Sequence, residues 1–286
     1  MDYSLDTIDL HMHSTVSDGT DTPAELLDRV KDAGITIFSL TDHDAIEGCR
    51  IIAGRVRDRG LRFIAGVEFS CRDELGKYHI LGYGYDPDKA PIQNVVQMGH
   101  DIRMNKLSMR LEQLKAQFGF GFEQEDVDAL YALDNPGKPH IANLMVRYGY
   151  APNKEMAIDA YLDKLKVRRQ NVAPDVAIQA ILESGGIPVL AHPPYGSGNE
   201  IILGTDLSDR VIRLMDYGLK GLETFYSGYT PVMVAEVASL AKKHGLYMTA
   251  GSDYHGSNKL VELGDTGFDD KKEISEALSG FLDRCL

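Results

Sequence analysis

Short, mostly apolar runs alternate with amphipathic stretches along the first third of the chain. Apolar and β-branched residues dominate four runs, which predicts buried strands at 7–10, 35–40, 61–69 and 78–85. Helical periodicity fills 22–33 and 45–59, and the first of these stretches opens on Thr22-Pro23, with proline where a helix tolerates it. Gly34 closes that helix. This part of the chain therefore predicts strands joined by helices.

The pattern changes between 91 and 180, where amphipathic helical periodicity continues without a convincing strand. Leu107, Leu111 and Leu114 fall on one face of the first helix in this segment. Further helices, separated by turns rich in glycine and proline, are predicted at 126–133, 140–148 and 154–165. Strands alternate with helices again towards the end of the chain, at 187–191, 221–225 and 246–250.

Strands that alternate with helices at this spacing predict parallel strands joined by crossover helices. We count about seven strands outside the helical segment. The predicted fold class is therefore α/β, as a closed or nearly closed (β/α) barrel that an α-helical insertion interrupts. The predicted units are the first part of the barrel at 1–90, a helical insertion that supplies a substrate pocket or lid at 91–180, and the second part of the barrel at 181–286.

Composition limits the partners of the chain. Among its 286 residues, 43 acidic side chains against 30 basic ones give a net charge of −13, which argues against a protein that coats long duplex nucleic acid. Cys49, Cys71 and Cys285 form neither a CxxC pair nor a disulfide framework, which favours a reducing compartment. The N-terminus does not resemble a signal peptide, and no apolar run approaches the ~20 residues of a membrane span. We therefore expect a cytoplasmic protein with no membrane partner.

Polar side chains with the chemistry of metal ligands follow the predicted strands. His11 and His13 end the first strand, and two histidines at i and i+2 on an extended chain point the same way, so they can hold one cation. Asp253 and His255 repeat this spacing after the last strand. The C-terminal ends of barrel strands form the face where active sites are built. The remaining candidates on this predicted rim are Asp18, His43, Glu68, His79 and His192.

Each candidate also has an ordinary structural explanation when it is considered alone. A buried histidine is more often a hydrogen-bonded core residue than a ligand, and an aspartate after a strand commonly caps the next helix. Six imidazoles and three carboxylates on one rim would nevertheless be electrostatically unfavourable without cations. Their number and placement together predict a metal cluster. The mixture of neutral nitrogen and anionic oxygen suits Zn, Mn or Fe better than Ca or Mg.

Taken together, these short motifs resemble those of the PHP superfamily (polymerase and histidinol phosphatase), and among its members the stand-alone, TrpH-like phosphoesterases. The matching motifs are His11-Met12-His13-Ser14, Thr41-Asp42-His43, Gly66-Val67-Glu68, His79-Ile80-Leu81-Gly82-Tyr83-Gly84, Ala191-His192-Pro193 and Ser252-Asp253-Tyr254-His255. Any one motif is weak, but their order and number make the resemblance specific. It covers essentially the whole chain, including the predicted insertion.

The resemblance implies a distorted (β/α)7 barrel, the TIM-like PHP fold, with two to three divalent transition metals (Mn, Zn or Fe) in a centre of up to three ions. Glu68 would bridge two of them. The implied ligands are His11, His13, Glu68 and Asp253 for the first metal, Glu68, His79 and His192 for the second, and Asp18, His43 and His255 for the third.

The same resemblance implies a metal-dependent phosphoric ester hydrolase. A hydroxide that bridges the first two metals would attack phosphorus in line with the leaving alkoxide, which makes Glu68 and Asp253 catalytic ligands. The leaving alkoxide needs a proton, and His140 is the candidate donor, with metal-bound water as the alternative.

Substrate contacts are expected in the insertion. Lys138 and His140 resemble the family's RPHxA element, with lysine in place of the usual arginine, so that a point charge replaces a bidentate phosphate contact. Arg168 and Arg169 are further cationic candidates, although a solvated helix end explains them equally well.

An acidic chain with a candidate pocket favours small phosphorylated metabolites over long nucleic acid. Nucleotides are the leading substrates, such as 3′,5′-bisphosphonucleosides or cyclic nucleotide phosphates, giving a nucleoside monophosphate and phosphate. The alternatives are an exonuclease that acts on the ends of short oligonucleotides, a histidinol-phosphate phosphatase, an amidohydrolase, or a structural PHP module without activity. Retention of all nine ligand positions disfavours the structural module.

Overall fold

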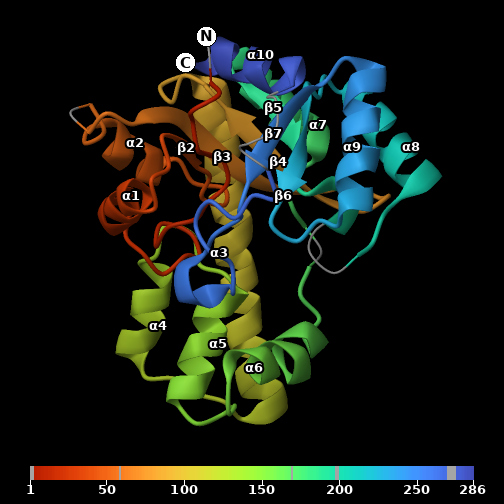
Figure 1. Ribbon diagram of the computed structural model, residues 1–286. Coiled ribbons are helices and arrows are strands. Elements are labelled where there is room, and N and C mark those ends of the chain that lie inside the picture. Colours follow the sequence, from red (N-terminus) through yellow and green to blue (C-terminus); the bar gives the residue numbers. More distant parts are fainter. Residues whose placement is uncertain (1–2, 58, 169, 197–199, 269–274) are drawn as a thin grey trace.

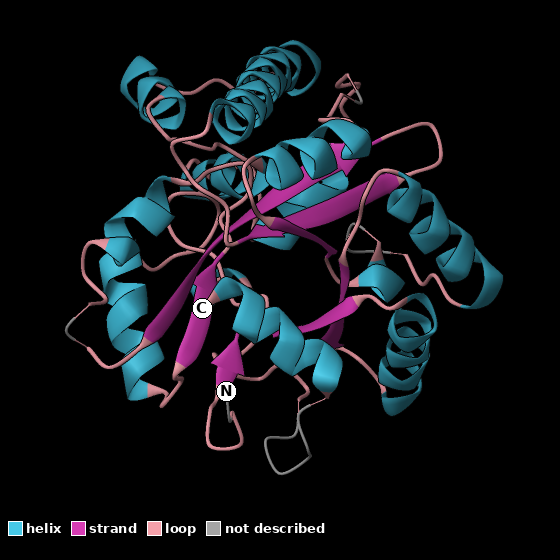
Figure 2. Cartoon of the chain, turned by 90° about the horizontal axis from the view of Figure 1, so that it is seen from above, coloured by secondary structure: helices cyan, strands magenta, loops and turns pink. Residues whose placement is uncertain are grey.

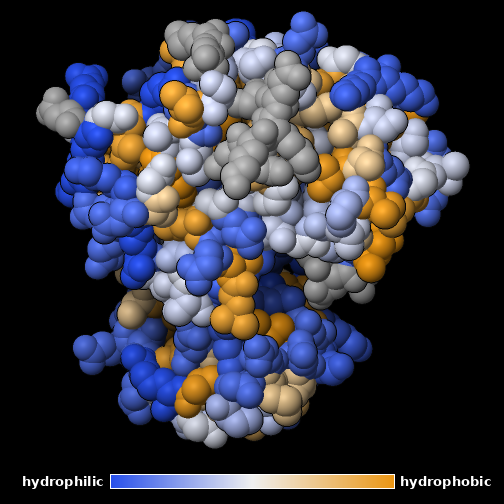
Figure 3. Space-filling model, viewed as in Figure 1, coloured by the Kyte–Doolittle hydropathy of each residue, from blue (hydrophilic) through white to orange (hydrophobic). Residues whose placement is uncertain are grey.

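Two bodies make up the computed structural model, which describes residues 3–57, 59–168, 170–196, 200–268 and 275–286. A barrel with helices around it contains both ends of the chain, and a smaller helical body hangs below it in the view of Figure 1. Figure 3 shows a waist between the two bodies. One long helix, α3 (Ala90–Phe118), runs from the barrel into the helical body and connects them.

Seven strands form one sheet in the order β1-β2-β3-β4-β5-β6-β7. Hydrogen bonds from Leu10 N to Ala250 O and from His13 N to Tyr254 O connect the first strand to the last, so the sheet nearly closes into a barrel. Figure 2 shows the strands curving around a centre with helices outside them. The strands are β1 (Ile8–Asp9), β2 (Ile37–Leu40), β3 (Arg62–Arg72), β4 (Lys77–Tyr83), β5 (Ile187–Leu190), β6 (Gly221–Tyr226) and β7 (Tyr247–Gly251). This confirms the predicted distorted (β/α)7 barrel.

The expectation of parallel strands throughout is wrong for β4, which pairs antiparallel with both β3 and β5. A tight turn joins β3 to β4, in which Asp73 Oδ1 accepts hydrogen bonds from the backbone N–H groups of Leu75 and Gly76. Such a turn is too short for the helix that a parallel crossover needs. As a consequence, Glu68 lies within β3 rather than at its end, and His79 lies in the first half of β4, paired with Ser70.

Helices cover the outside of the barrel, and their apolar faces pack inwards against its strands. Leu26, Leu27 and Val30 of α1 are buried, as are Ala177, Ile178 and Ile181 of α7, which contacts β3, β4 and β5. Proline opens both of these helices, as the sequence predicts for the first. The barrel helices are α1 (Pro23–Asp32), α2 (Glu47–Ala53), α7 (Pro174–Glu183), α8 (Gly204–Asp216), α9 (Pro231–His244) and α10 (Glu276–Cys285).

The helical body has a hydrophobic core of its own. In α3, Ile92 and Ile102 belong to the barrel core, whereas Leu107 and Leu114 pack into the second core, which extends to Leu165. The helices that complete this body are α4 (Gln124–Tyr131), α5 (Lys138–Arg147) and α6 (Lys154–Ala160), followed by the 3-10 turn η1 (Leu162–Lys164). The bounds 91–180 for the insertion stay a prediction.

Among the described residues, none of the helices combines the length and the apolar character that a membrane crossing requires. Cys49 and Cys71 are buried and Cys285 is partly buried, each as a free thiol.

Candidate metal centre

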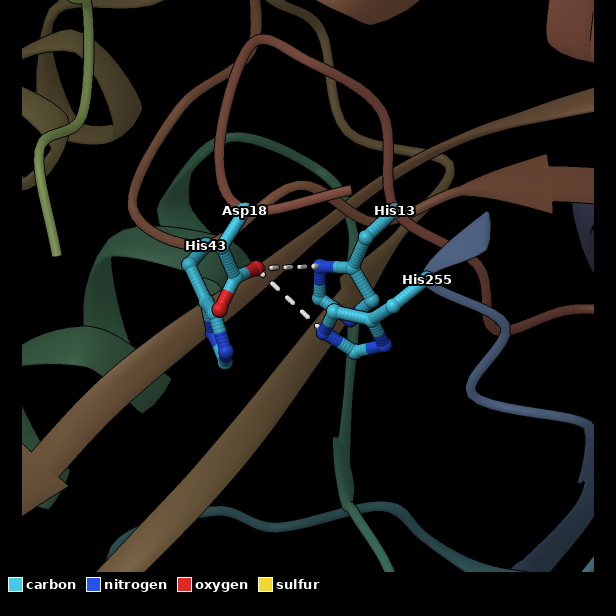
Figure 4. Close-up of side chains that lie close together, drawn as sticks. All are labelled: His13, Asp18, His43 and His255. Carbon is cyan, nitrogen blue, oxygen red and sulfur yellow. Dashed lines mark ion pairs between the residues drawn. The ribbon is translucent and has the colours of Figure 1, made fainter. Parts of the chain in front are cut away.

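The structure brings all nine predicted ligands to one rim of the barrel. Seven of them come from the segments that follow β1, β2, β5 and β7. The β3–β4 hairpin supplies Glu68 and His79. Figure 4 shows four of these side chains, from three separate segments, turned towards one another. The order of the strands in the sheet thus gathers residues that lie far apart in the sequence.

Glu68 lies at the centre of this cluster and is 1% exposed. Its Oε2 atom lies 3.2 Å from Nε2 of His11, 3.2 Å from Nε2 of His13 and 3.1 Å from Nδ1 of His43. Its Oε1 atom lies 2.9 Å from Nδ1 of His79 and 3.2 Å from Nε2 of His192. A carboxylate with imidazoles on both oxygens is placed to bridge two cations.

Two aspartates flank this centre. Asp253 Oδ1 lies 3.4 Å from His11 Nε2, 3.3 Å from His13 Nε2 and 3.5 Å from His255 Nδ1. Asp18 Oδ1 lies 3.3 Å from His255 Nε2 and 3.8 Å from His13 Nδ1, the two contacts drawn in Figure 4. The two sides of the His13 ring thus face different carboxylates, and His13 connects the two halves of the cluster.

The donor atoms of the cluster fit metal ions better than they fit one another. Within the part of the chain that the structure describes, five of these buried atoms make no hydrogen bond: His11 Nε2, His13 Nε2, Asp18 Oδ1, His43 Nδ1 and His192 Nδ1. Buried polar atoms without partners are costly, and converging lone pairs are what a cation requires. A mixture of nitrogen and oxygen donors suits Zn, Mn or Fe.

Three groups of donor atoms, each within 4.8 Å of one another, could hold an ion. They are His11, His13, Glu68 and Asp253; His43, Glu68 and His79; and His13, Asp18, His43 and His255. The first has the ligands that the resemblance implies for the first metal. In the second, His43 stands in place of His192, whose ring nevertheless lies 3.3 Å from His79 Nδ1. The third adds His13 to the implied set.

The electrostatics of the cluster favour charged carboxylates despite their burial. Burial alone would raise the pKa of Glu68, but His11, His79 and His43 together hold it well below its usual range. Burial works to lower the pKa of His11, whereas the carboxylates of Glu223 and Glu68 raise it well above its usual value. For His43, burial is the dominant effect and lowers the pKa. Ionised carboxylates beside histidines are the setting in which a metal can displace the histidine protons.

A buried glutamate that the sequence reasoning missed orients two of the histidines. Glu223, in β6, accepts a hydrogen bond from His11 Nδ1 at 2.8 Å and from the backbone N–H of His192 at 2.7 Å. A proton on Nδ1 leaves the Nε2 lone pair of His11 free for a metal. A Cβ atom at Gly251 would lie 2.3 Å from His11 Cβ, so only glycine fits there. The signal in the sequence was an acidic residue inside an otherwise apolar strand.

The backbone is strained at this rim. In the described ranges, the non-glycine residues with positive φ are Asp44 (50°), His192 (29°) and Asp253 (59°), and each is a predicted ligand or follows one directly. Such conformations cost about 1–3 kcal/mol each and persist only where the surroundings fix them. They are a second sign that this rim is a functional site.

A cation that the sequence reasoning also missed lies at the edge of the cluster. Lys259 Nζ donates to the Tyr226 hydroxyl at 2.7 Å and pairs with Asp253 Oδ2. The Tyr226 hydroxyl in turn donates to the same carboxylate oxygen at 2.8 Å. These residues line an open cavity of about 550 Å³ that reaches Glu68 and also contains Tyr195. This cavity gives small molecules access to the cluster.

The two predicted residues of the insertion lie near the cluster without joining it. His140 Nδ1 accepts a hydrogen bond from Gly137 N at 3.0 Å at the start of α5, and burial lowers its pKa, so the neutral ring with its proton on Nε2 is favoured. Lys138 Nζ pairs with Asp163, and Lys138 lines a cavity that also contains His43. Arg168 is exposed, whereas Arg169 lies outside the described residues. Their roles in catalysis and substrate binding stay predictions.

Comparisons with known proteins agree with this geometry. A family model described as PHP domain matches residues 9–170. The chain is 30% identical over 257 residues to a 3′,5′-nucleoside bisphosphate phosphatase from Chromobacterium violaceum, across 87% of each chain. It is 29% identical over 259 residues to a 5′-3′ exoribonuclease from Haemophilus influenzae, across 90% of this chain and 92% of that one. A solved structure from Bifidobacterium adolescentis, assigned as a metal-dependent phosphoesterase, matches 99% of this chain and 97% of that one with a TM-score of 0.84 and 26% identity.

Proposed function

The chain belongs to the PHP domain family of metal-dependent phosphoesterases, and from this premise we propose that it hydrolyses phosphate esters of small nucleotides. The substrates of the proposal are nucleoside 3′,5′-bisphosphates and cyclic nucleotide phosphates, which would give a nucleoside monophosphate and phosphate. The observation that carries it is the set of buried, unpartnered donor atoms around Glu68, together with an open cavity that reaches them.

The nine predicted ligands supply the donors for two to three divalent metals. Divalent metals held there would polarise the phosphoryl oxygens and make hydroxide available near neutral pH. Glu68 would be shared between two ions because both of its oxygens face imidazoles. Mn, Zn or Fe are the metals of the proposal, since each donor group mixes nitrogen with oxygen.

Residues around the ligands fix and balance the site. Glu223 holds His11 in the tautomer that leaves Nε2 free, which fixes the ring before a metal arrives. Lys259 places a positive charge beside Asp253 at the mouth of the cavity, where an anionic substrate must enter. His140 remains the proposed source of the proton for the leaving alkoxide. Lys138 remains the proposed phosphate contact, because its side chain lies in the cavity beside His43.

A substrate panel tests this function on protein purified without chelator. Phosphate release would be compared for adenosine 3′,5′-bisphosphate, a short 5′-phosphorylated RNA and histidinol phosphate, with elemental analysis of the same preparation. We expect the bisphosphate to be hydrolysed fastest, activity to be lost on chelation, and activity to return with Mn, Zn or Fe. Metal-loaded protein that releases phosphate from none of the three would contradict the proposal.

A second candidate is an exonuclease that acts on short oligonucleotides, because three relatives are named 5′-3′ exoribonuclease. Short RNA is therefore the partner to test after small nucleotides, and faster turnover of the RNA in the same panel would favour it.

The compartment of this activity is inferred to be the cytoplasm. The three free thiols of the chain fit a reducing environment.

A further inference from the structure

A groove with cationic walls leads away from the metal cluster, between the β3–β4 hairpin and the helical body. Two adjoining cavities form it, of about 230 Å³ and 470 Å³. The first contains the predicted ligands Asp18 and His43, and the second contains His79, so both open on the cluster. The residues that line both cavities are Ser70, Lys106, Arg110, Lys138 and Asn171. We call this feature the cationic groove.

Some cations of the groove are neutralised by carboxylates. Arg103 binds Asp44 Oδ2 through both Nε and Nη2, at 2.7 Å each, and Nη2 also donates to Ser70 Oγ at 2.8 Å. Lys138 pairs with Asp163 at the other end. The carboxylates that line the groove are Asp44 and Asp163, which belong to these two pairs, and the predicted ligand Asp18.

Two cations of α3 form no ion pair with a carboxylate among the residues that the structure describes, although Asp44 and Asp163 lie near enough to act on their charges. Lys106 Nζ donates to the neutral Asn171 Oδ1 at 2.8 Å. Among the described residues, Arg110 Nε is a buried atom without a hydrogen-bond partner. Burial, with Arg103 and Arg110 nearby, lowers the pKa of Lys106 to about 8, and burial with Arg103 lowers that of Arg110 to about 10. Like charges held together in this way favour a bound anion, in a chain whose net charge is −13.

The chemistry of the groove favours a phosphate group. A guanidinium and an ammonium within one narrow cavity match the oxygens of a phosphate, and such charge-assisted hydrogen bonds are stronger than neutral ones. The cavity of about 550 Å³ that contains Tyr195 differs from the groove in its charge, because its cation, Lys259, is already paired with Asp253. A nucleotide with one phosphate at the metal cluster therefore has a place for a second phosphate on the side of the groove.

Resting on the proposed function, we propose that Lys106 and Arg110 bind the phosphate of the substrate that is not hydrolysed. The groove thereby selects nucleotides that carry a second phosphate over simple phosphomonoesters. The second phosphate can be the other phosphate of a bisphosphonucleoside or the next phosphodiester of a short oligonucleotide, and both present the same oxygens to these cations.

The activity test compares Arg110→Met and Lys106→Met on two substrates, adenosine 3′,5′-bisphosphate and p-nitrophenyl phosphate. We expect kcat/KM for the bisphosphate to fall about 10- to 100-fold, mainly through KM, because a charge-assisted contact is lost. Turnover of p-nitrophenyl phosphate should change less than about twofold, since it has no second phosphate. Lys243→Met, an exposed lysine of α9, is the matched control and should change neither. Equal losses on both substrates, or no loss on the bisphosphate, would overturn the proposal.

A binding test separates this inference from the proposed function. Calorimetry with chelator-treated protein would measure the affinity for adenosine 3′,5′-bisphosphate, and we expect weaker binding by both methionine variants but not by Lys243→Met. A 5′-phosphorylated dinucleotide is the second ligand tested. If Arg110→Met weakens binding of the dinucleotide more than binding of the bisphosphate, the groove is assigned to a phosphodiester. If neither anion distinguishes the variants from the unmodified protein, the groove does not bind phosphate. If the variants do differ while no substrate is hydrolysed, the inference stands and the proposed function fails.

Discussion

The metal cluster and the cationic groove adjoin each other but are built in different ways. The cluster rests on the barrel, where backbone hydrogen bonds between neighbouring strands set the position of each ligand. The groove depends on two bodies with separate cores, because Lys106 and Arg110 come from α3 and Ser70 from β3. Under the proposed function, the barrel would provide the reaction and the helical body would adjust the choice of substrate.

Among variants that affect one region and not the other, Glu68→Ala in the cluster should cause the largest loss of turnover. This change removes the carboxylate that faces five imidazoles, so we expect turnover to fall at least about a thousandfold and metal content to drop. Phosphate release and elemental analysis would measure it. Glu112→Ala, an exposed glutamate of α3, is the control. Near-normal activity of Glu68→Ala would refute the assignment of the cluster, and Asp253→Ala should behave like Glu68→Ala for the same reason.

The barrel and the gathering of the nine candidate ligands at its rim were largely predictable from sequence, for a local reason. Strand positions follow from apolar runs, and ligands such as His11 and His192 come just after such runs. The antiparallel β4 was not predicted, because the alternation of strands and helices suggested a crossover where the chain makes a tight turn near Asp73. The helix expected over 45–59 also ends early, at Ala53, where Gly54 follows.

The groove could not be predicted, because it depends on how the helical body lies against the barrel. The sequence does carry one signal, in that Arg103, Lys106 and Arg110 are spaced to share a helix face. A solvated face would have the same pattern, so only the position of Ser70 and Asn171 opposite these cations reveals a site. Glu223 was missed for a similar reason, since its partners His11 and His192 come from distant strands.

Glu223→Ala should test whether the cluster depends on its supporting hydrogen bonds. Loss of the bonds to His11 Nδ1 and to the His192 backbone should weaken metal affinity about 10- to 100-fold. Glu223→Gln keeps an acceptor and should lose less. Metal titration followed by calorimetry measures the affinity, and activity at saturating metal should recover further than affinity does. Unchanged affinity in the alanine variant would show that Glu223 does not position these ligands.

A pair of core variants should separate the two regions directly. Leu114 lies fully buried in the core of the helical body and Leu222 fully buried in that of the barrel, so alanine at either should cost about 2–5 kcal/mol of stability. We expect Leu114→Ala to keep its metal content and p-nitrophenyl phosphate turnover but to lose about tenfold in preference for the bisphosphate. Leu222→Ala should instead lower metal content. Parallel losses of both properties in Leu114→Ala would show that the two bodies do not act separately.

The smallest expected effect is a pH dependence confined to the groove. Because the pKa of Lys106 is lowered to about 8, its charge is present at pH 7 and is lost as the pH rises towards 9. The affinity of chelator-treated protein for adenosine 3′,5′-bisphosphate should therefore fall a few-fold over that range. Arg103, Arg110, Lys77 and Asp44 are the charged groups that act on Lys106.

Arg110 and Lys77 also bear on the pH profile, because both are cations near Lys106 with lowered pKa values. Burial lowers the pKa of Arg110 only to about 10, so Arg110 stays largely charged over this range. Burial with Lys138 and Arg72 nearby lowers the pKa of Lys77, which can add to the decline. Lys106→Arg is therefore the decisive control, because a guanidinium keeps its charge up to pH 9 and leaves Lys77 unchanged. A flatter affinity profile in Lys106→Arg would assign the pH dependence to Lys106. If the arginine variant loses affinity as steeply as the unmodified chain, Lys106 does not hold the second phosphate, and the contrast between a reactive barrel and a selective helical body loses its main support.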